Sequence, residues 1–315
     1  MPTINHENAL MDVLEMLSTS PKWLGLAHAI KGVNERNPFD IDDHKLDALM
    51  WIEQCTINFP ILYLSCLYLY IYAQQKGCKT FLFASRDCCQ MYKLFAKMFP
   101  DADAHYFNCS RNMFEVSIED PEANLPFRDY VESLVGHHVD KSIYIDVHGT
   151  GKRVFAYFEK EFRKVPYCFL LSATCRDYDD FPDICRRYER QNKLVNLAFN
   201  VRGGPIESLN YDLQGTLQGY DEIRGPIRDK LEYDYDKVEP YHRCIDLIVK
   251  YLVPLDTKTL ADKYDLYDLR QLITKIFKLI KDDLPAVLKK FDHVRKHKKT
   301  EIKTGSEKKK RHRHR

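Results

Sequence analysis

The chain has 315 residues, of which 44% are hydrophobic and 30% charged, and it carries a formal net charge of +2. This length and composition suit one large or two modest globular domains with a substantial core, and the 20 Tyr and 17 Phe favour a packed fold over a disordered chain. The last 23 residues carry +9, with eleven Lys and Arg against two Asp and Glu, so the rest of the chain carries −7.

Residues 1–55 are predicted to form a helical N-terminal extension that is interrupted at Pro21 and Pro38. The following stretch, 54–75, contains no charged residue and is long enough to cross a bilayer. It is also rich in tyrosine, contains a proline and leads directly into a predicted strand. We therefore predict a helix over 60–76 that is buried against a sheet, and we expect no membrane span.

A regular alternation of strands and helices follows. Helices are predicted at 88–98, 127–136 and 152–163, with an irregular acidic stretch at 115–128, and strands at 79–84, 104–109, 142–146, 167–173 and 194–200. Such alternation implies βαβ units and a parallel sheet with helices on both faces. The predicted fold class is therefore α/β, with a three-layer, Rossmann-like core at 56–240 and helical additions at both ends. In such sheets, ligands bind beyond the carboxyl ends of the strands.

The pattern changes within the last third of the chain. Residues 202–240 are rich in Gly, Pro, Tyr and charge, which predicts a long ordered loop or a small β excursion with a functional role. Helical spacing predicts C-terminal helices over 241–292, and 293–315 read as a disordered basic tail. Its end, 308–315, could contact nucleic-acid phosphates weakly and without sequence preference. The acidic body and the lack of a recognised motif predict no specific nucleic-acid binding.

Ten cysteines are scattered through the chain without a CxxC pair or a Cys/His cluster at zinc spacing. Most lie in apolar segments, which is typical of reduced thiols in an intracellular protein. The N-terminus lacks a basic region followed by an apolar one, so no signal peptide is expected. Together these features predict a cytoplasmic location.

Three predicted strand ends carry residues that suit an anion. They are Ser85-Arg86-Asp87, Ser110-Arg111 and the segment DVHGTGK at 146–152. In the third, glycines let the backbone approach an anion, and the following helix offers free N–H groups and the positive end of its dipole. Strand-to-helix turns also favour Gly, Thr and Asp for structural reasons, and an Arg-Asp pair can be a simple ion pair.

The residues within 146–152 have distinct chemistry. Thr150 offers a hydroxyl and Lys152 a positive charge, both of which suit phosphate. Asp146 repels phosphate, but its carboxylate suits sugar hydroxyls or a magnesium-bound water. An aspartate beside a phosphate-binding turn therefore predicts a phosphorylated sugar or a nucleotide as ligand.

The order of these motifs resembles the type I phosphoribosyltransferases. The resemblance is closer to the phosphoribosyltransferase-like domains found beside phosphatase domains in bacterial polysaccharide loci. It covers roughly residues 60–240 and rests on FASRDC at 83–88, NCSRN at 108–112 and DVHGTG at 146–151. The chain departs from the family pattern at Val147, where a second acidic residue is usual, in a loop that is one residue shorter, and at Cys88, where the relatives have glycine. The phosphatase domain of those relatives has no counterpart on this chain.

The resemblance implies a glycosyltransferase that moves phosphoribose from phosphoribosyl pyrophosphate to a hydroxyl of a sugar, a glycan or another acceptor. Asp146 would hold the ribose hydroxyls, and Arg86 and Arg111 would stabilise the departing pyrophosphate. Mg²⁺ would bind largely through the diphosphate, and no protein metal ligand is expected. The 5-phosphate would be bound by Gly149, Thr150, Gly151 and Lys152, with Ser85 and Ser110 as further substrate-binding residues.

The acceptor hydroxyl would need a general base. Asp87, His148 and Glu207 are candidates, and the sequence does not choose among them. Glu207 and Tyr220 lie in the long loop, where an acceptor or a lid is expected.

Two other functions stay open. A haloacid-dehalogenase-like phosphatase begins with a strand ending D-x-D-G-T, which DVHGT at 146–150 approaches, and Ser172 could supply its second motif. His148 stands where that family has its acid/base aspartate, however, and Asp179-Asp180 follows no predicted strand. The second alternative is a non-catalytic binding module on the same fold, for which Val147 is the main support.

Overall fold

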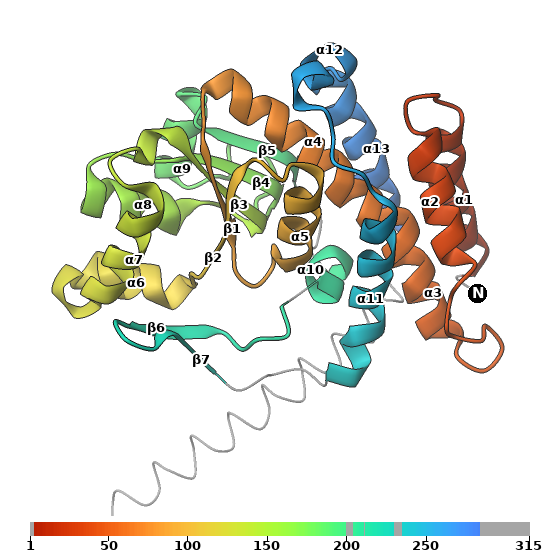
Figure 1. The fold of residues 1–315 in the computed structure, drawn as a ribbon, viewed down its shortest axis with the longest axis horizontal. Helices are drawn as coiled ribbons and strands as arrows, with labels where there is room; N and C mark the ends of the chain where they lie inside the picture. The colour runs from red at the N-terminus through yellow and green to blue at the C-terminus, as the bar shows by residue number, and fades with distance from the viewer. Residues whose placement is uncertain (1–2, 200–203, 211, 230–234, 284–315) are drawn as a thin grey trace, which may run out of the picture.

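The structure is a computed structural model, and it describes residues 3–199, 204–210, 212–229 and 235–283 (Figure 1). Its centre is a five-stranded, all-parallel sheet in the order β2-β1-β3-β4-β5. The strands are β1 (Thr80–Ala84), β2 (Asp103–Phe107), β3 (Ser142–Gly149), β4 (Tyr167–Ala173) and β5 (Leu194–Phe199). This order reverses direction between β1 and β3, which is the position where open α/β sheets form a ligand crevice.

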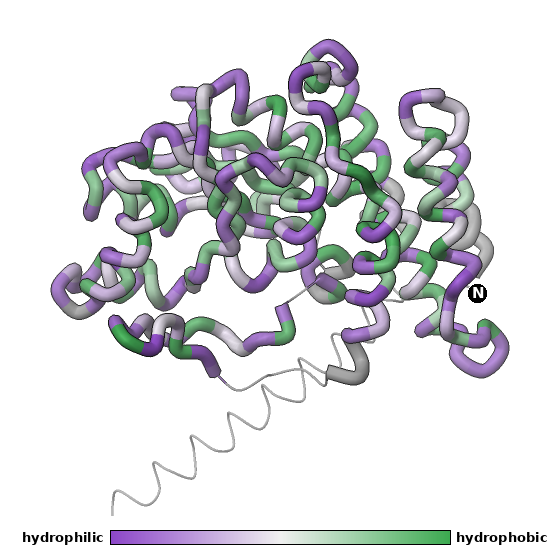
Figure 2. Tube along the Cα trace, viewed as in Figure 1, coloured by the Kyte–Doolittle hydropathy of each residue, from purple (hydrophilic) through white to green (hydrophobic). Residues whose placement is uncertain are grey.

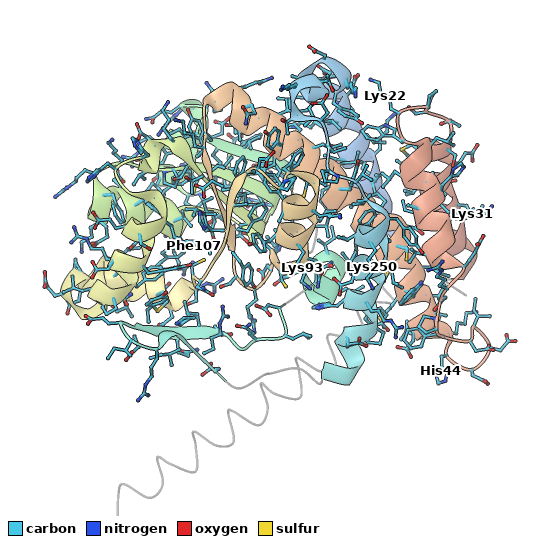
Figure 3. The ribbon with its side chains drawn as sticks, in the orientation of Figure 1. Lys22, Lys31, His44, Lys93, Phe107 and Lys250 are labelled. Carbon is cyan, nitrogen blue, oxygen red and sulfur yellow. The ribbon has the colours of Figure 1, made fainter. Side chains whose placement is uncertain are left out.

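Helices cover both faces of the sheet, which confirms the predicted three-layer α/β fold with helical additions (Figure 1). One face packs against α4 (Phe59–Lys76), α5 (Cys89–Met98) and α13 (Leu266–Asp283). There the rings of Phe81 and Phe83 lie 4.8 and 5.0 Å from that of Phe95. The other face packs against α6 (Arg111–Glu119), α7 (Leu125–Val135), α8 (Lys152–Phe162) and α9 (Asp183–Arg190). Phe107, at the end of β2, packs there between aromatic rings of α6 and α7 (Figure 3).

The uncharged stretch forms α4, preceded by a π-helical turn, η1 (Gln54–Asn58). In the described residues, the continuous helix Lys45–Lys76 is long and apolar enough to cross a membrane, with a mean hydropathy of 1.4 in its most apolar window. In the structure 89% of that window is buried inside the protein. Tyr70, for example, stacks on Phe99 at 4.1 Å. The stretch is therefore a core helix against the sheet, and hydrophobic residues gather there and in the strands (Figure 2).

The helical additions pack together beside the α4 face of the sheet. The N-terminal helices are α1 (Thr3–Ser18), α2 (Leu24–Asn34) and α3 (Lys45–Glu53), and they contact α11 (Tyr235–Tyr251), α13 and η1. Trp23 stacks on Tyr264 at 5.1 Å, which joins the N-terminal helices to the C-terminal ones. Lys31 and His44 lie on the outer side of this helical layer, away from the sheet, whereas Lys22 lies between the α1–α2 turn and the start of α13, where it lines a cavity with Tyr264 and Asp268 (Figure 3).

Several segments differ from the prediction. The acidic stretch 115–128 is largely helical, because Ser110 caps α6 by accepting the N–H of Met113 and η2 (Pro121–Asn124) leads into α7. The helix α9 was not predicted, because its eight residues are fewer than the roughly 11–18 over which apolar periodicity identifies a helix, although its two buried residues, Cys185 and Tyr188, share one face.

The segment 202–240 contains more regular structure than a loop. It includes α10 (Gly204–Asn210), the antiparallel hairpin of β6 (Leu217–Asp221) and β7 (Gly225–Arg228), and the start of α11. The hairpin agrees with the expected β excursion. After α11 come η4 (Thr257–Thr259), α12 (Leu260–Lys263) and α13, while the predicted tail at 293–315 lies outside the described residues.

All ten cysteines are free thiols in the structure, and nine of them are buried. Burial raises the pKa of the Cys88 and Cys168 thiols well above its usual value. A thiol that stays protonated is a poor nucleophile, so these side chains act as small core residues.

Candidate functional site

A cavity of about 340 Å³ opens at the carboxyl ends of β1 and β3, where the strand order reverses. Its walls come from the ends of four strands and from the first turns of α6 and α8, with one residue from α10. The lining residues are Ala84, Ser85, Asp87, Cys109, Ser110, Arg111, Phe114, Tyr144, Asp146, His148, Gly149, Thr150, Gly151, Lys152, Arg153, Val154, Thr174 and Glu207.

The Ser85 side chain links the end of β1 to the end of β2 by hydrogen bonds. Its hydroxyl donates to the carbonyl of Cys109 at 2.9 Å and accepts the N–H of the same residue at 3.2 Å. The Ser85–Arg86 peptide bond is cis. Ser110, at the next strand end, is the N-cap of α6, since its Oγ accepts the N–H of Met113 at 3.2 Å. Both serines therefore hold backbone in place at the rim of the cavity.

The N-terminal ends of two helices meet at the cavity. Ser110 and Arg111 begin α6, while Gly151 and Lys152 begin α8, and all four residues line the cavity. Because helix N-termini present unpaired N–H groups and partial positive charge, the two ends together favour an anion. The two helices are joined by an ion pair of Arg153 Nε with Glu115 Oε1 at 2.5 Å.

The turn before α8 needs its second glycine. Gly151 has a φ of 75°, a left-handed conformation that side chains disfavour. A Cβ there would also lie 3.1 Å from the Cys168 sulfur. Thr150 accepts the N–H of Lys152 at 3.3 Å, and its carbonyl accepts a hydrogen bond from the Cys185 thiol at 3.1 Å. These two hydrogen bonds therefore fix the conformation of the turn, in which Thr150 and Lys152 line the cavity.

Asp146 lies at the centre of the site. The strand β3 runs to Gly149, three residues beyond the predicted end, so Asp146 lies within the strand and pairs with Leu170. Alternation puts Tyr144, Asp146 and His148 on one face, and all three line the cavity. Val147 points to the opposite face and is buried in the core, so an acidic side chain there would not reach the cavity.

The environment of Asp146 raises its pKa to about 7, mainly because the carboxyl is surrounded by protein. The negative charge of Glu207 raises the pKa further. The backbone N–H of His148, which reaches Asp146 Oδ1 at 3.4 Å, and the hydroxyl of Tyr144 lower it. Near neutral pH the carboxyl therefore exists in both protonation states, which suits a group that accepts hydroxyl hydrogen bonds or a proton.

The structure brings together eleven of the thirteen residues predicted for the site. They are Ser85, Asp87, Ser110, Arg111, Asp146, His148, Gly149, Thr150, Gly151, Lys152 and Glu207. Two predicted residues do not line the cavity. Arg86 is half-buried beside it, with its carbonyl accepting the N–H groups of Cys89 and Asp212. Tyr220 lies in β6 and stacks on Tyr130 of α7 at 4.6 Å.

Sequence reasoning missed several lining residues. Tyr144 is two residues before Asp146 in a strand, so the alternation of side chains could have found it. Thr174 directly follows β4, so the rule of strand ends applies to it as well. Phe114 and Arg153 carried no such signal, because their position depends on how α6 packs against α8.

In the described residues, no group of three or more His, Cys, Asp or Glu side chains is arranged to hold a metal ion. The cavity does hold Asp87, Asp146 and Glu207, whose carboxylates can accept hydrogen bonds from metal-bound water. A magnesium ion at this site would therefore depend on oxygen ligands from a bound substrate.

Comparison of the chain with protein-family models, with curated proteins and with solved structures finds no match in any of the three. The fold and the cavity therefore carry the functional interpretation.

Proposed function

We propose that the protein is a phosphoribosyltransferase-like glycosyltransferase that binds phosphoribosyl pyrophosphate and transfers phosphoribose to a hydroxyl of a sugar, a glycan or another acceptor. One observation carries the proposal. Two helix N-termini with Arg111 and Lys152 meet in a single cavity around Asp146, at the switch point of a parallel sheet. A ligand with two anionic groups and a hydroxyl-bearing ring matches that arrangement.

The turn from Gly149 to Lys152 would bind the 5-phosphate. This assignment is supported by the N-terminus of α8, the Thr150 hydroxyl and the Lys152 ammonium group, which all lie at the cavity. The first turn of α6, with Arg111, would bind the pyrophosphate. Stabilising the charge that develops on this leaving group is the main catalytic contribution that we assign to the protein. Magnesium, bound through the diphosphate, would share that charge.

Asp146 would accept hydrogen bonds from the ribose hydroxyls. Its support is its position between the two anion-binding ends and its pKa of about 7, which leaves a large carboxylate fraction at neutral pH. Asp87, His148 and Glu207 line the same cavity, so each can reach an acceptor hydroxyl as its general base. Arg86 and Tyr220, which do not line the cavity, have less support as substrate-binding residues.

A haloacid-dehalogenase-like phosphatase has less support. Such an enzyme needs a second acidic pair near its nucleophilic aspartate, and Asp179-Asp180 does not line the cavity. Asp180 instead accepts hydrogen bonds from the Arg176 side chain at 3.1 and 3.3 Å. His148 also occupies the position of that family's acid/base aspartate.

The proposal is tested by ³¹P NMR of the protein with phosphoribosyl pyrophosphate, Mg²⁺ and a panel of sugar acceptors. A transferase releases pyrophosphate in an acceptor-dependent reaction that Asp146→Ala abolishes. Release of inorganic phosphate from phosphate esters would favour the phosphatase. A protein that binds phosphoribosyl pyrophosphate but releases neither product under any acceptor would be the binding module.

A further inference from the structure

The helix α10 brings Glu207 to the cavity, although it belongs to neither the sheet nor its covering helices. It has seven residues and packs against β3, η1 and α11. Leu209, on one side of α10, packs against Met50 of α3 and Tyr241 of α11. The position of Glu207 therefore depends on helices outside the α/β core.

A buried hydrogen-bond network makes this attachment specific. Gln54 Nε2 donates to Asn210 Oδ1 at 2.8 Å and to the Tyr241 carbonyl at 3.3 Å. Gln54 Oε1 accepts from Asn58 Nδ2 at 2.7 Å, and Asn210 Nδ2 donates to the carbonyl of Ile206 at 2.7 Å. Gln54 and Asn58 are fully buried and Asn210 is 1% exposed, so these bonds face no competition from bulk water.

Gln54 and Asn58 lie in η1, where the helix widens to a π-helical turn. Such turns often occur at functional sites. Asn210 is one helical turn after Glu207, so the network ends directly beneath the residue that enters the cavity.

We propose that Gln54 and Asn210 are positioning residues, which fix Glu207 beside Asp146 and so make the N-terminal helical extension part of the substrate site. The inference deepens the proposed function, on which it rests for the role of Asp146 in substrate binding. It predicts that a change in η1, which does not line the cavity, alters the chemistry of Asp146 through Glu207.

The readout is the titration of Asp146, because Glu207 bears on it directly. The other groups near that carboxyl are Tyr144 on the same strand and the thiols of Cys88, Cys109 and Cys168. The remaining titratable and charged residues that line the cavity are Asp87, Arg111, His148, Lys152 and Arg153. None of these residues belongs to α10, which is the helix that Gln54 contacts. A change in the Asp146 midpoint that follows a substitution in η1 is therefore assigned to Glu207.

The experiment is a ¹³C NMR titration of the full chain labelled at the aspartate side-chain carboxyls, with the Asp146 signal assigned from its loss in Asp146→Asn. The variants are Gln54→Met and Asn210→Leu, which roughly keep the side-chain size but remove the hydrogen bonds, and Glu207→Gln. The control is Asn34→Leu, which removes the 3.0 Å bond from Asn34 Nδ2 to Thr56 Oγ1 in the same π-helical turn without touching α10.

We expect wild type to titrate near pH 7, and Glu207→Gln to lower the midpoint by about one pH unit because a like charge is removed. Gln54→Met and Asn210→Leu should lower it in the same direction, and Gln54→Met combined with Glu207→Gln should lower it no further than Glu207→Gln alone. The control should titrate as wild type does. If either η1 or α10 variant fails to fold, as judged by circular dichroism, the other one carries the test.

A folded Gln54→Met or Asn210→Leu protein with a wild-type midpoint would overturn the proposal, and so would a Glu207→Gln protein with no shift. The titration needs no ligand. A wild type that does not bind phosphoribosyl pyrophosphate would therefore refute the proposed function, while the positioning role would stand or fall with the NMR midpoints.

Discussion

The carboxylate of Asp146 lies against the bare backbone of Gly149, so closely that a Cβ on Gly149 would come within 2.7 Å of Asp146 Oδ2. Real side-chain contacts to a Cβ are longer than this, so any residue but glycine must displace the carboxylate. Gly149 itself belongs to β3 and pairs with Ala173 of β4. The glycine is therefore required by the site and not by the conformation of the strand.

Gly149→Ala should weaken the binding of phosphoribosyl pyrophosphate while the fold persists. The methyl group pushes the Asp146 carboxylate from its place, and losing one hydrogen bond to a charged group is worth about 1.5–3 kcal/mol, or roughly tenfold or more in affinity. Calorimetric titration and thermal unfolding measure the two effects. The control is Gly32→Ala in α2, where a Cβ meets nothing within 4 Å. Unchanged affinity in Gly149→Ala would contradict the placement of the sugar at Asp146.

The affinity for phosphoribosyl pyrophosphate should rise between pH 6 and pH 8. The pKa of Asp146 is about 7, so the carboxylate to which we assign the ribose hydroxyls forms over this range. Substrate phosphates also titrate, with a pKa of about 6, but they do so equally in every variant. Calorimetry at constant free Mg²⁺ should therefore show a steeper pH dependence in wild type than in Asp146→Asn. Equal slopes would mean that the ionisation of Asp146 plays no part in binding.

The buried Glu53 should make the protein less stable as the pH rises. Burial raises its pKa from 4.5 to about 8, and neither side-chain oxygen has a hydrogen-bond partner in the part of the chain that the structure describes. Between these two pH values the folded protein keeps a proton that the unfolded chain releases. The stability that this retained proton gives the folded protein is therefore fully present below pH 4.5. The free energy of unfolding then falls as the pH rises towards 8, by at most about 1.4 kcal/mol per pH unit.

Glu53→Gln removes that titration. Urea unfolding at pH 5 and pH 8 should show the variant gaining stability relative to wild type at the higher pH. Glu132→Gln, at an exposed position on α7, is the matched control and should show no such trend. A stability difference between Glu53→Gln and wild type that is the same at both pH values would show that Glu53 is not held in its protonated form.

Arg111 and Arg86 should differ in their effect on binding. Arg111 lines the cavity in the first turn of α6, whereas Arg86 lies beside the cavity without lining it. We expect Arg111→Met to lower the affinity for phosphoribosyl pyrophosphate about tenfold or more, as for the loss of a charge-assisted hydrogen bond. Arg86→Met should have a smaller effect in the same calorimetric assay. The reverse order would assign the pyrophosphate to the turn after β1.

The sequence predicts the α/β core well because its strands are short apolar runs that are separated by helices of regular period. Both ends of each predicted strand lie within three residues of the ends seen in the structure. The largest error in the strands is at β3, which extends to Gly149 because His148 and Gly149 continue to pair with β4. Glycine is a weak strand former, so only the neighbouring strand could reveal this extension.

The strand-end rule found most of the cavity, because the carboxyl ends of parallel strands lie at one edge of the sheet whatever their sequence distance. It could not place Arg86, whose neighbours Ser85 and Asp87 face the cavity while Arg86 does not. It also could not predict the network from Gln54 to Asn210, which joins residues 156 positions apart. Such long-range contacts depend on how the added helices pack on the core, so local sequence patterns do not predict them.

The most direct test of the central claim is calorimetric titration of the purified protein with phosphoribosyl pyrophosphate and Mg²⁺, beside Asp146→Ala. We predict micromolar binding by wild type that Asp146→Ala abolishes, with the variant still folded by circular dichroism. No binding by folded wild-type protein, or equal binding by Asp146→Ala, would contradict the claim that this cavity holds phosphoribosyl pyrophosphate.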